Sequence, residues 1–104
     1  MKKILFEVLT PLNFSVLITE DYWNMIISIK HPVMNGKENE VRLTLNDPDE
    51  IRQSLKDENV YLFYKMQRQR RWICAVIKDN DKNGFLITAY PTDNIKEGKV
   101  IWKK

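Results

Sequence analysis

Three strand-like segments follow one another in the second half of the chain, and they constrain the fold more than any other feature. They cover residues 60–66, 71–78 and 84–90, and each is rich in β-branched and aromatic side chains. The polar residues 79–84 are typical of a turn. Strands joined by short connections predict neighbouring antiparallel strands of one sheet, and residues 100–102 predict a further edge strand.

The first half of the chain predicts a β-hairpin followed by a helix. Residues 3–9 and 13–18 are short apolar segments separated by a turn-like sequence, which favours a hairpin. Thr19 and the two carboxylates after it are typical of a helix start, and Pro32 predicts that this helix ends at residue 30 or 31. Helical spacing places four of its side chains toward the core: Tyr22, Met25, Ile26 and Ile29.

Two further helices are expected before the three strands. One covers residues 37–45. The other follows residues 47–50, which have the N-cap carboxylate, the proline and the glutamate of a helix start, and it covers about residues 51–55. These elements predict an α+β fold with an N-terminal β-hairpin and two to three helices packed on a curved antiparallel sheet of about four strands.

Length and composition are those of one folded domain. The chain has 104 residues, of which 43% are hydrophobic, and we expect residues 1–104 to form a single domain. No apolar segment is long enough to span a membrane. Cys74 is the single cysteine, so it forms no internal disulfide, which predicts a cytoplasmic protein. The net charge of +3 permits polyanion binding without indicating it.

Several chemistries lack the residues that they require. One histidine and one cysteine give neither zinc-finger spacing nor the ligand set of an ordinary zinc hydrolase, so we expect no metal site. We find no glycine-rich phosphate loop and expect no cofactor. Cys74 lies in an apolar segment, which argues against a Cys–His hydrolase. What remains is acid–base chemistry on a phosphodiester, with the 2′-hydroxyl of RNA as nucleophile.

His31 is the first candidate for that chemistry. It lies at the expected C-terminus of the first helix, where the negative end of the helix dipole favours a protonated imidazole. A protonated imidazole suits a general acid. The alternative interpretation is a half-exposed histidine that closes the helix end and has no other role.

A cluster of cations is the second candidate feature. Four basic residues lie within seven positions where two expected strands meet: Lys65, Arg68, Arg70 and Arg71. Arginine forks match phosphate oxygens, and an acidic protein partner would be attracted by the same charge. A solvated, charged turn is the alternative. Lys65 continues one face of its strand, which places its ammonium over the sheet and not at the tip.

The last long strand carries hydroxyl groups at every second position, in Thr88, Tyr90 and Thr92. Hydroxyls bind phosphate or ribose oxygens, and a tyrosine ring stacks on a base. Threonine and tyrosine also favour strands for purely structural reasons. Arg42 and Arg52 are both expected in the helical middle of the chain. Either suits the charge that develops on phosphorus, or an ion pair with Asp49, Glu50 or Asp57.

Five short segments, taken in order, carry a resemblance to a known family. They are Lys30-His31-Pro32, residues 41–54, residues 61–64, residues 72–78 and residues 87–93. This series resembles small bacterial proteins of the barnase–EndoU–colicin–RelE (BECR-like) ribonuclease superfamily, especially its phage and toxin branches. The resemblance implies a helical N-terminal part on a curved antiparallel sheet of about four strands. It also implies metal-independent RNA cleavage, often by a toxin that is paired with an antitoxin.

The resemblance also implies roles for individual residues. His31 matches the helix-borne histidine, Arg42 or Arg52 the middle basic residue, Lys65 the sheet-borne cation, and Thr88 the hydroxyl of the terminal strand, with Tyr90 or Thr92 beside it. The resulting hypothesis is an endoribonuclease in which His31 protonates the leaving 5′-oxygen. The residues expected to bind RNA around that centre are Lys30, Arg68, Arg70, Arg71 and Thr92. The single histidine excludes an EndoU-style histidine pair.

Two other functions stay open at this point. One is a non-catalytic RNA-binding module that uses the cations of residues 65–71 and the rings of Tyr61, Tyr64 and Tyr90. The other is a protein-interaction domain whose contact surface is the apolar N-terminal hairpin together with exposed tryptophans. RNA and an antitoxin protein are the expected partners, a homodimer is open, and we expect no membrane association.

Overall fold

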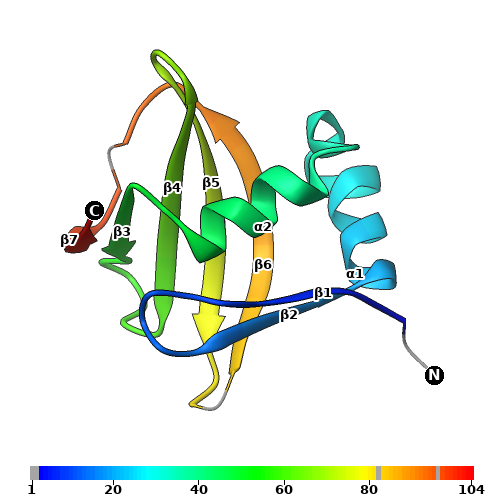
Figure 1. Ribbon diagram of the computed structural model, residues 1–104, viewed down its shortest axis with the longest axis horizontal. Helices are drawn as coiled ribbons and strands as arrows, with labels where there is room; N and C mark the ends of the chain where they lie inside the picture. The colour runs from blue at the N-terminus through cyan, green and yellow to red at the C-terminus, as the bar shows by residue number, and fades with distance from the viewer. Residues whose placement is uncertain (1–2, 82, 96) are drawn as a thin grey trace.

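A sheet of seven strands dominates the computed structural model, which describes residues 3–81, 83–95 and 97–104 (Figure 1). The strands along the described chain are β1 (Ile4–Leu9), β2 (Ser15–Thr19), β3 (Glu50–Gln53), β4 (Val60–Arg68), β5 (Arg71–Asp79), β6 (Asn83–Thr92) and β7 (Lys99–Lys103). Their order across the sheet is β1-β2-β6-β5-β4-β3-β7. The three long strands β4, β5 and β6 are antiparallel neighbours, as predicted, and β7 is an edge strand.

The predicted architecture of about four antiparallel strands under two to three helices is wrong. The N-terminal hairpin extends the sheet, because β2 pairs in parallel with the start of β6 through Ser15–Leu17 and Asn83–Phe85. The sheet is therefore mixed and larger than expected. Gly84 lies at this junction, where a Cβ would approach the Phe14 side chain to 2.7 Å. This parallel pairing joins residues 68 positions apart, as the difference between 15 and 83 shows, so local patterns do not reveal it.

The predicted helix at residues 51–55 is also wrong, because β3 occupies Glu50–Gln53. The backbone N–H of Asp49 donates to the Tyr64 carbonyl at 2.8 Å, and the Asp49 carboxylate accepts from the Met66 N–H at 2.7 Å. These bonds attach Asp49 to β4 instead of capping a helix. Ile51 is fully buried in the sheet, and its burial outweighs the local helix signal.

The first helical segment begins and ends where the sequence predicts. It consists of α1 (Glu20–Met25) and the π-helical turn η1 (Ile26–Lys30), and the side chain of Thr19 accepts a hydrogen bond from the Tyr22 N–H at 3.3 Å. The His31 N–H donates to the Ile26 carbonyl at 2.8 Å, which closes the wider π turn. That turn shifts the helical phase, so Ile29 is 76% exposed and the prediction that it faces the core is wrong.

The remaining helices lead across the sheet. The 3-10 turn η2 (Pro32–Met34) connects η1 to α2 (Glu38–Asn46), which lies within one residue of its predicted bounds. Figure 1 shows α2 crossing one face of the sheet, with α1 beside β6. None of the described helices is both long and apolar enough to cross a membrane.

Both faces of the central strands bury side chains. On the face covered by α2, the main core includes Val41, Leu45, Phe63, Ile77 and Leu86. On the opposite face, a smaller cluster contains Leu62, Tyr64 and Cys74, and Ile95 of the β6–β7 connection packs against it. Cys74 is fully buried, as its apolar neighbours in the sequence predict.

Candidate functional site

The single histidine lies beside the last long strand. The ring centroids of His31 and Tyr90 are 5.4 Å apart, with the planes inclined at 38°. The Tyr22 hydroxyl and the Lys30 ammonium both donate to the Ile87 carbonyl, at 3.0 and 2.9 Å. In the described chain, β2 pairs with β6 at Asn83–Phe85. After Phe85, residues of α1 and η1 lie against the edge of β6. Two of the candidate features from the sequence, His31 and the hydroxyl-bearing last long strand, thus lie together.

Tyr90 belongs to a row of polar side chains on the face away from α2. Cross-strand pairing joins Tyr90 to Cys74, Cys74 to Tyr64, and Tyr64 to Glu50. Burial, together with the neighbouring thiol of Cys74, raises the pKa of both Tyr64 and Tyr90 above the usual value of a phenol. Tyr90 is therefore a neutral ring at physiological pH, suited to stacking and hydrogen bonding and not to proton abstraction.

Burial raises the pKa of the Cys74 thiol to about 11, from an ordinary value of 9.0. At pH 8 this difference alone lowers the thiolate fraction by about 100-fold. We expect Cys74 to react with a thiol-specific chromogenic reagent at least that much more slowly in the native protein than in guanidinium. Rapid labelling of the native protein would contradict the buried position of this row.

The two threonines of β6 do not both present their hydroxyls to a ligand. Thr88 Oγ1 is buried and, within the described part of the chain, has no hydrogen-bond partner. Thr92 Oγ1 accepts from the Asn94 N–H at 3.2 Å and lies 3.0 Å from the Asn94 carbonyl, so it stabilises the turn after β6. Tyr90 is the β6 side chain in ring contact with His31.

The three cations expected to stabilise charge on phosphorus are engaged elsewhere. Arg42 donates to Asn39 on its own helix at 2.7 Å. Arg52 lies on β3, not on a helix, and forms an ion pair with Glu50. The Lys65 ammonium lies over the sheet and not at the hairpin tip, but it faces α2, on the opposite side of the sheet from Tyr90, and donates to the Asp47 carbonyl at 2.8 Å. The structure does not gather these three residues around His31.

Asp47 is the acidic partner of Lys65 on the α2 face of the sheet. Hydrogen bonds from Lys104 and Lys65 hold the pKa of the Asp47 carboxyl below its usual value, so the carboxylate stays charged under physiological conditions. The Lys104 ammonium lies 3.0 Å from Asp47 Oδ1. Both lysines therefore share one acidic partner, which offsets one of their two positive charges.

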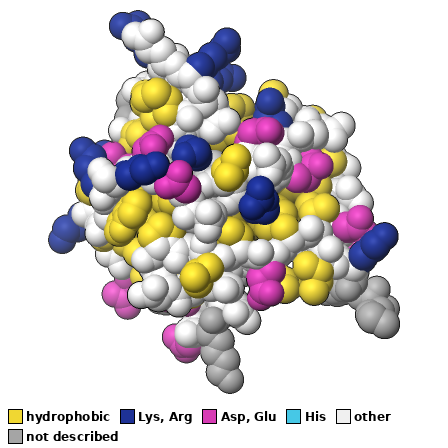
Figure 2. All heavy atoms as spheres, viewed as in Figure 1, with side chains coloured by type: hydrophobic (Ala, Val, Ile, Leu, Met, Phe, Trp, Pro, Cys, Tyr) yellow, Lys and Arg dark blue, Asp and Glu magenta, His cyan; other side chains and the backbone are white. Residues whose placement is uncertain are grey.

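The hairpin tip between β4 and β5 carries three arginines close together. Arg68, Arg70 and Arg71 lie there, and none of the ion pairs in the described residues includes them or Lys37. The tip projects beyond the sheet in Figure 1, and Figure 2 shows dark blue side chains gathered at the same end of the molecule. Exposed cations without acidic partners are free to bind phosphates.

Arg70 occupies a strained backbone position at this tip. Its φ is 60°, in the left-handed region that favours glycine. We expect Arg70→Gly to raise the free energy of unfolding by about 0.5–1 kcal/mol, since the release of strain exceeds the entropic cost of glycine. The same variant is expected to bind RNA more weakly and with a smaller salt dependence. Urea denaturation and fluorescence anisotropy measure the two effects, and a gain in both stability and affinity would contradict a binding role for Arg70.

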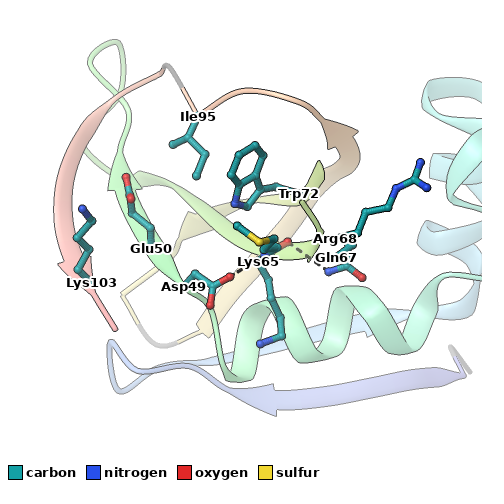
Figure 3. A pocket seen from close by; sticks show the side chains of 9 residues that line it. Asp49, Glu50, Lys65, Gln67, Arg68, Trp72, Ile95 and Lys103 are labelled. Carbon is teal, nitrogen blue, oxygen red and sulfur yellow. Dashed lines mark hydrogen bonds between the residues drawn. The ribbon is translucent and has the colours of Figure 1, made fainter. Parts of the chain in front are cut away.

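Two pockets flank the tip and share three lining residues, Gln67, Arg68 and Trp72. The larger, the carboxylate pocket, has a volume of about 540 Å³ and also includes Asp49 and Glu50 (Figure 3). The smaller, the basic pocket, has a volume of about 310 Å³. Its lining comprises Val33, Lys37, Gln67, Arg68, Arg71, Trp72, Ile73 and Pro91. In Figure 3 the ammonium end of Lys65 points toward α2, away from Trp72 and Ile95.

Sequence reasoning missed two members of this region. Lys37 lies just before α2, with no local signal that connects it to the hairpin tip. Trp72 directly follows the basic cluster, and that adjacency was the available signal. Among the described residues, no group of three or more His, Cys, Asp or Glu side chains is arranged to hold a metal ion.

Comparisons with protein-family models, with curated proteins and with solved structures give no match. The resemblance to BECR-like ribonucleases therefore stays a prediction, and the functional argument depends on the side chains themselves.

Proposed function

We propose that this protein is an endoribonuclease that uses the 2′-hydroxyl of its RNA substrate as the nucleophile. The contact between His31 and Tyr90 is the observation that carries the proposal. It places the one imidazole of the chain against a neutral aromatic ring, at the end of the sheet where the unpaired arginines lie. An imidazole is the side chain best suited to proton transfer near neutral pH.

In the proposed reaction, the 2′-oxygen forms a bond to phosphorus as the bond from phosphorus to the 5′-oxygen breaks. The protonated imidazole of His31 gives its proton to the leaving 5′-oxygen, and water takes the proton of the 2′-hydroxyl. The products are a 2′,3′-cyclic phosphate and a 5′-hydroxyl end. Tyr90 orients the imidazole and a neighbouring base, while Arg68, Arg70 and Arg71 bind phosphates along the strand.

RNA binding without cleavage is the second candidate. The observation that favours it is that Arg42, Arg52 and Lys65 bond to other groups of the protein. Without them, the charge that develops on phosphorus has fewer compensating groups near His31. An antitoxin partner and a homodimer stay predictions from the sequence, and the single buried cysteine supports the proposed cytoplasmic location.

A cleavage assay separates the two candidates. The purified protein is incubated in EDTA with an end-labelled single-stranded RNA and with the same sequence carrying 2′-deoxyribose throughout. We expect the RNA to yield 2′,3′-cyclic phosphate ends, and the deoxy strand to bind without cleavage. Binding of both strands with no product supports the second candidate, and failure to bind either strand contradicts both.

A further inference from the structure

The basic pocket combines the two kinds of group that a nucleotide needs. Lys37, Arg68 and Arg71 contribute positive charge, while Val33, Pro91 and the half-buried residue Trp72 contribute apolar lining. The volume of about 310 Å³ lies at the lower end of the range for small-molecule sites. None of the residues lining this pocket is acidic.

The carboxylate pocket is larger but less suited to a phosphate. Asp49 and Glu50 line it, and Lys65, which also lines it, is hydrogen-bonded to Asp47. Glu50 is paired with Arg52, but Asp49 belongs to none of the ion pairs in the described residues, so its carboxylate repels a phosphate group even though Lys103 and Arg68 lie nearby. The distribution of charge therefore favours the smaller pocket as the anion site.

We propose that the basic pocket binds one unpaired nucleotide of an RNA strand. Arg68, Arg71 and Lys37 bind its phosphate, and its base packs against Trp72. Arginine forks match phosphate oxygens, and stacking on an aromatic ring tolerates any base. This inference rests on the proposed function for the identity of the ligand, and it adds that the strand is single at this point.

The position of the pocket along the chain fits this role. Val33 lies two residues after His31, and Pro91 follows Tyr90 directly. The segment from His31 to Lys37 passes from the ring contact with Tyr90 to the pocket wall. A nucleotide in the pocket therefore sits next to the residues proposed to act on the phosphodiester. A base that is packed against Trp72 cannot pair in a duplex, so the pocket selects single strands.

Nucleotide binding is measurable without any cleavage. We use adenosine 5′-monophosphate as the probe and follow the three tryptophan indole N–H signals by NMR. The Trp72 signal, assigned with Trp72→Phe, is expected to shift on titration, while those of the buried Trp23 and of Trp102 on β7 stay in place. Adenosine and inorganic phosphate, each supplying half of the ligand, are expected to bind at least about tenfold more weakly.

Two variants that each remove one positive charge distinguish binding in a defined pocket from general electrostatic attraction of the phosphate. Arg71→Ala removes a cation of the basic pocket, and Lys103→Ala removes one from the carboxylate pocket. We expect Arg71→Ala to weaken binding of the monophosphate about tenfold and Lys103→Ala to change it less than twofold. Equal losses in the two variants, or an unmoved Trp72 signal, overturn the proposal.

The test also separates this inference from the proposed ribonuclease activity. If the wild-type protein binds the monophosphate at Trp72 but never cleaves RNA, the nucleotide site stands and the reaction does not. If RNA is cleaved and Trp72→Ala and Arg71→Ala leave its KM and kcat unchanged, the reaction stands and the nucleotide site is refuted.

Discussion

Replacing His31 with alanine is expected to lower the rate of RNA cleavage by about 10²- to 10⁴-fold, the usual contribution of a general acid. The imidazole is the proposed proton donor to the 5′-oxygen, and the chain has no second histidine to take its place. Tyr90 cannot substitute for it, because its raised pKa makes it a weak acid as well as an unavailable base. Single-turnover cleavage of an end-labelled RNA measures this loss separately from substrate binding.

The matched control for this variant is Asn24→Ala. Asn24 is an exposed residue of the preceding helix α1 with no role in the proposed site, so its replacement is expected to leave the rate unchanged. Circular dichroism establishes that both variants fold. Cleavage at the wild-type rate by His31→Ala would remove the imidazole from the mechanism and leave the Tyr90 contact as a structural one.

The second large effect is expected from a pair of glycine substitutions. Gly98 and Gly36 both have a φ of +84°, so an alanine at either position adopts a strained left-handed backbone. At Gly98, which lies just before β7, a Cβ would also approach the backbone carbonyl oxygen of Gln53 to 2.6 Å, while at Gly36 it would meet no atom within 4 Å. We expect Gly98→Ala to lower the free energy of unfolding by about 2–4 kcal/mol and Gly36→Ala by about 1 kcal/mol.

Urea denaturation of the two variants isolates the close contact from the backbone strain that they share. The difference between them reports how tightly the β6–β7 connection is held against β3. Because that connection covers the face with Tyr64 and Cys74, Gly98→Ala is also expected to speed the labelling of Cys74. Equal destabilisation by the two substitutions would show that β7 and its connection do not pack against β3 in this way.

The fold shows where local patterns suffice. The strands at β4, β5 and β6 follow from runs of β-branched and aromatic residues separated by short polar turns. The Thr19 cap and Pro32 likewise define the limits of the first helical segment, because capping and proline geometry act over one turn. Residues 47–50 show the limit of such signals. Their sequence is typical of a helix start, yet a strand that buries Ile51 forms there instead.

For the candidate site, too, the sequence predicted some features and the tertiary structure decided the others. The sequence alone identified the single imidazole, the hydroxyl-bearing strand and the basic hairpin, because each depends on residue type and on periodicity along one segment. Glu50 was also among the carboxylates open to Arg52 from the sequence, because the two residues lie two positions apart on β3. Only the tertiary structure decided that His31 meets Tyr90, that Lys65 pairs with Asp47, and that Lys37 joins the hairpin arginines. The physical reason is that contacts and ion pairs form between side chains that are close in space, whatever their separation along the chain. For Lys65, the antiparallel pairing of β3 with β4 decides that Asp47 lies within reach, and the residues around Lys65 in the sequence do not contain that information.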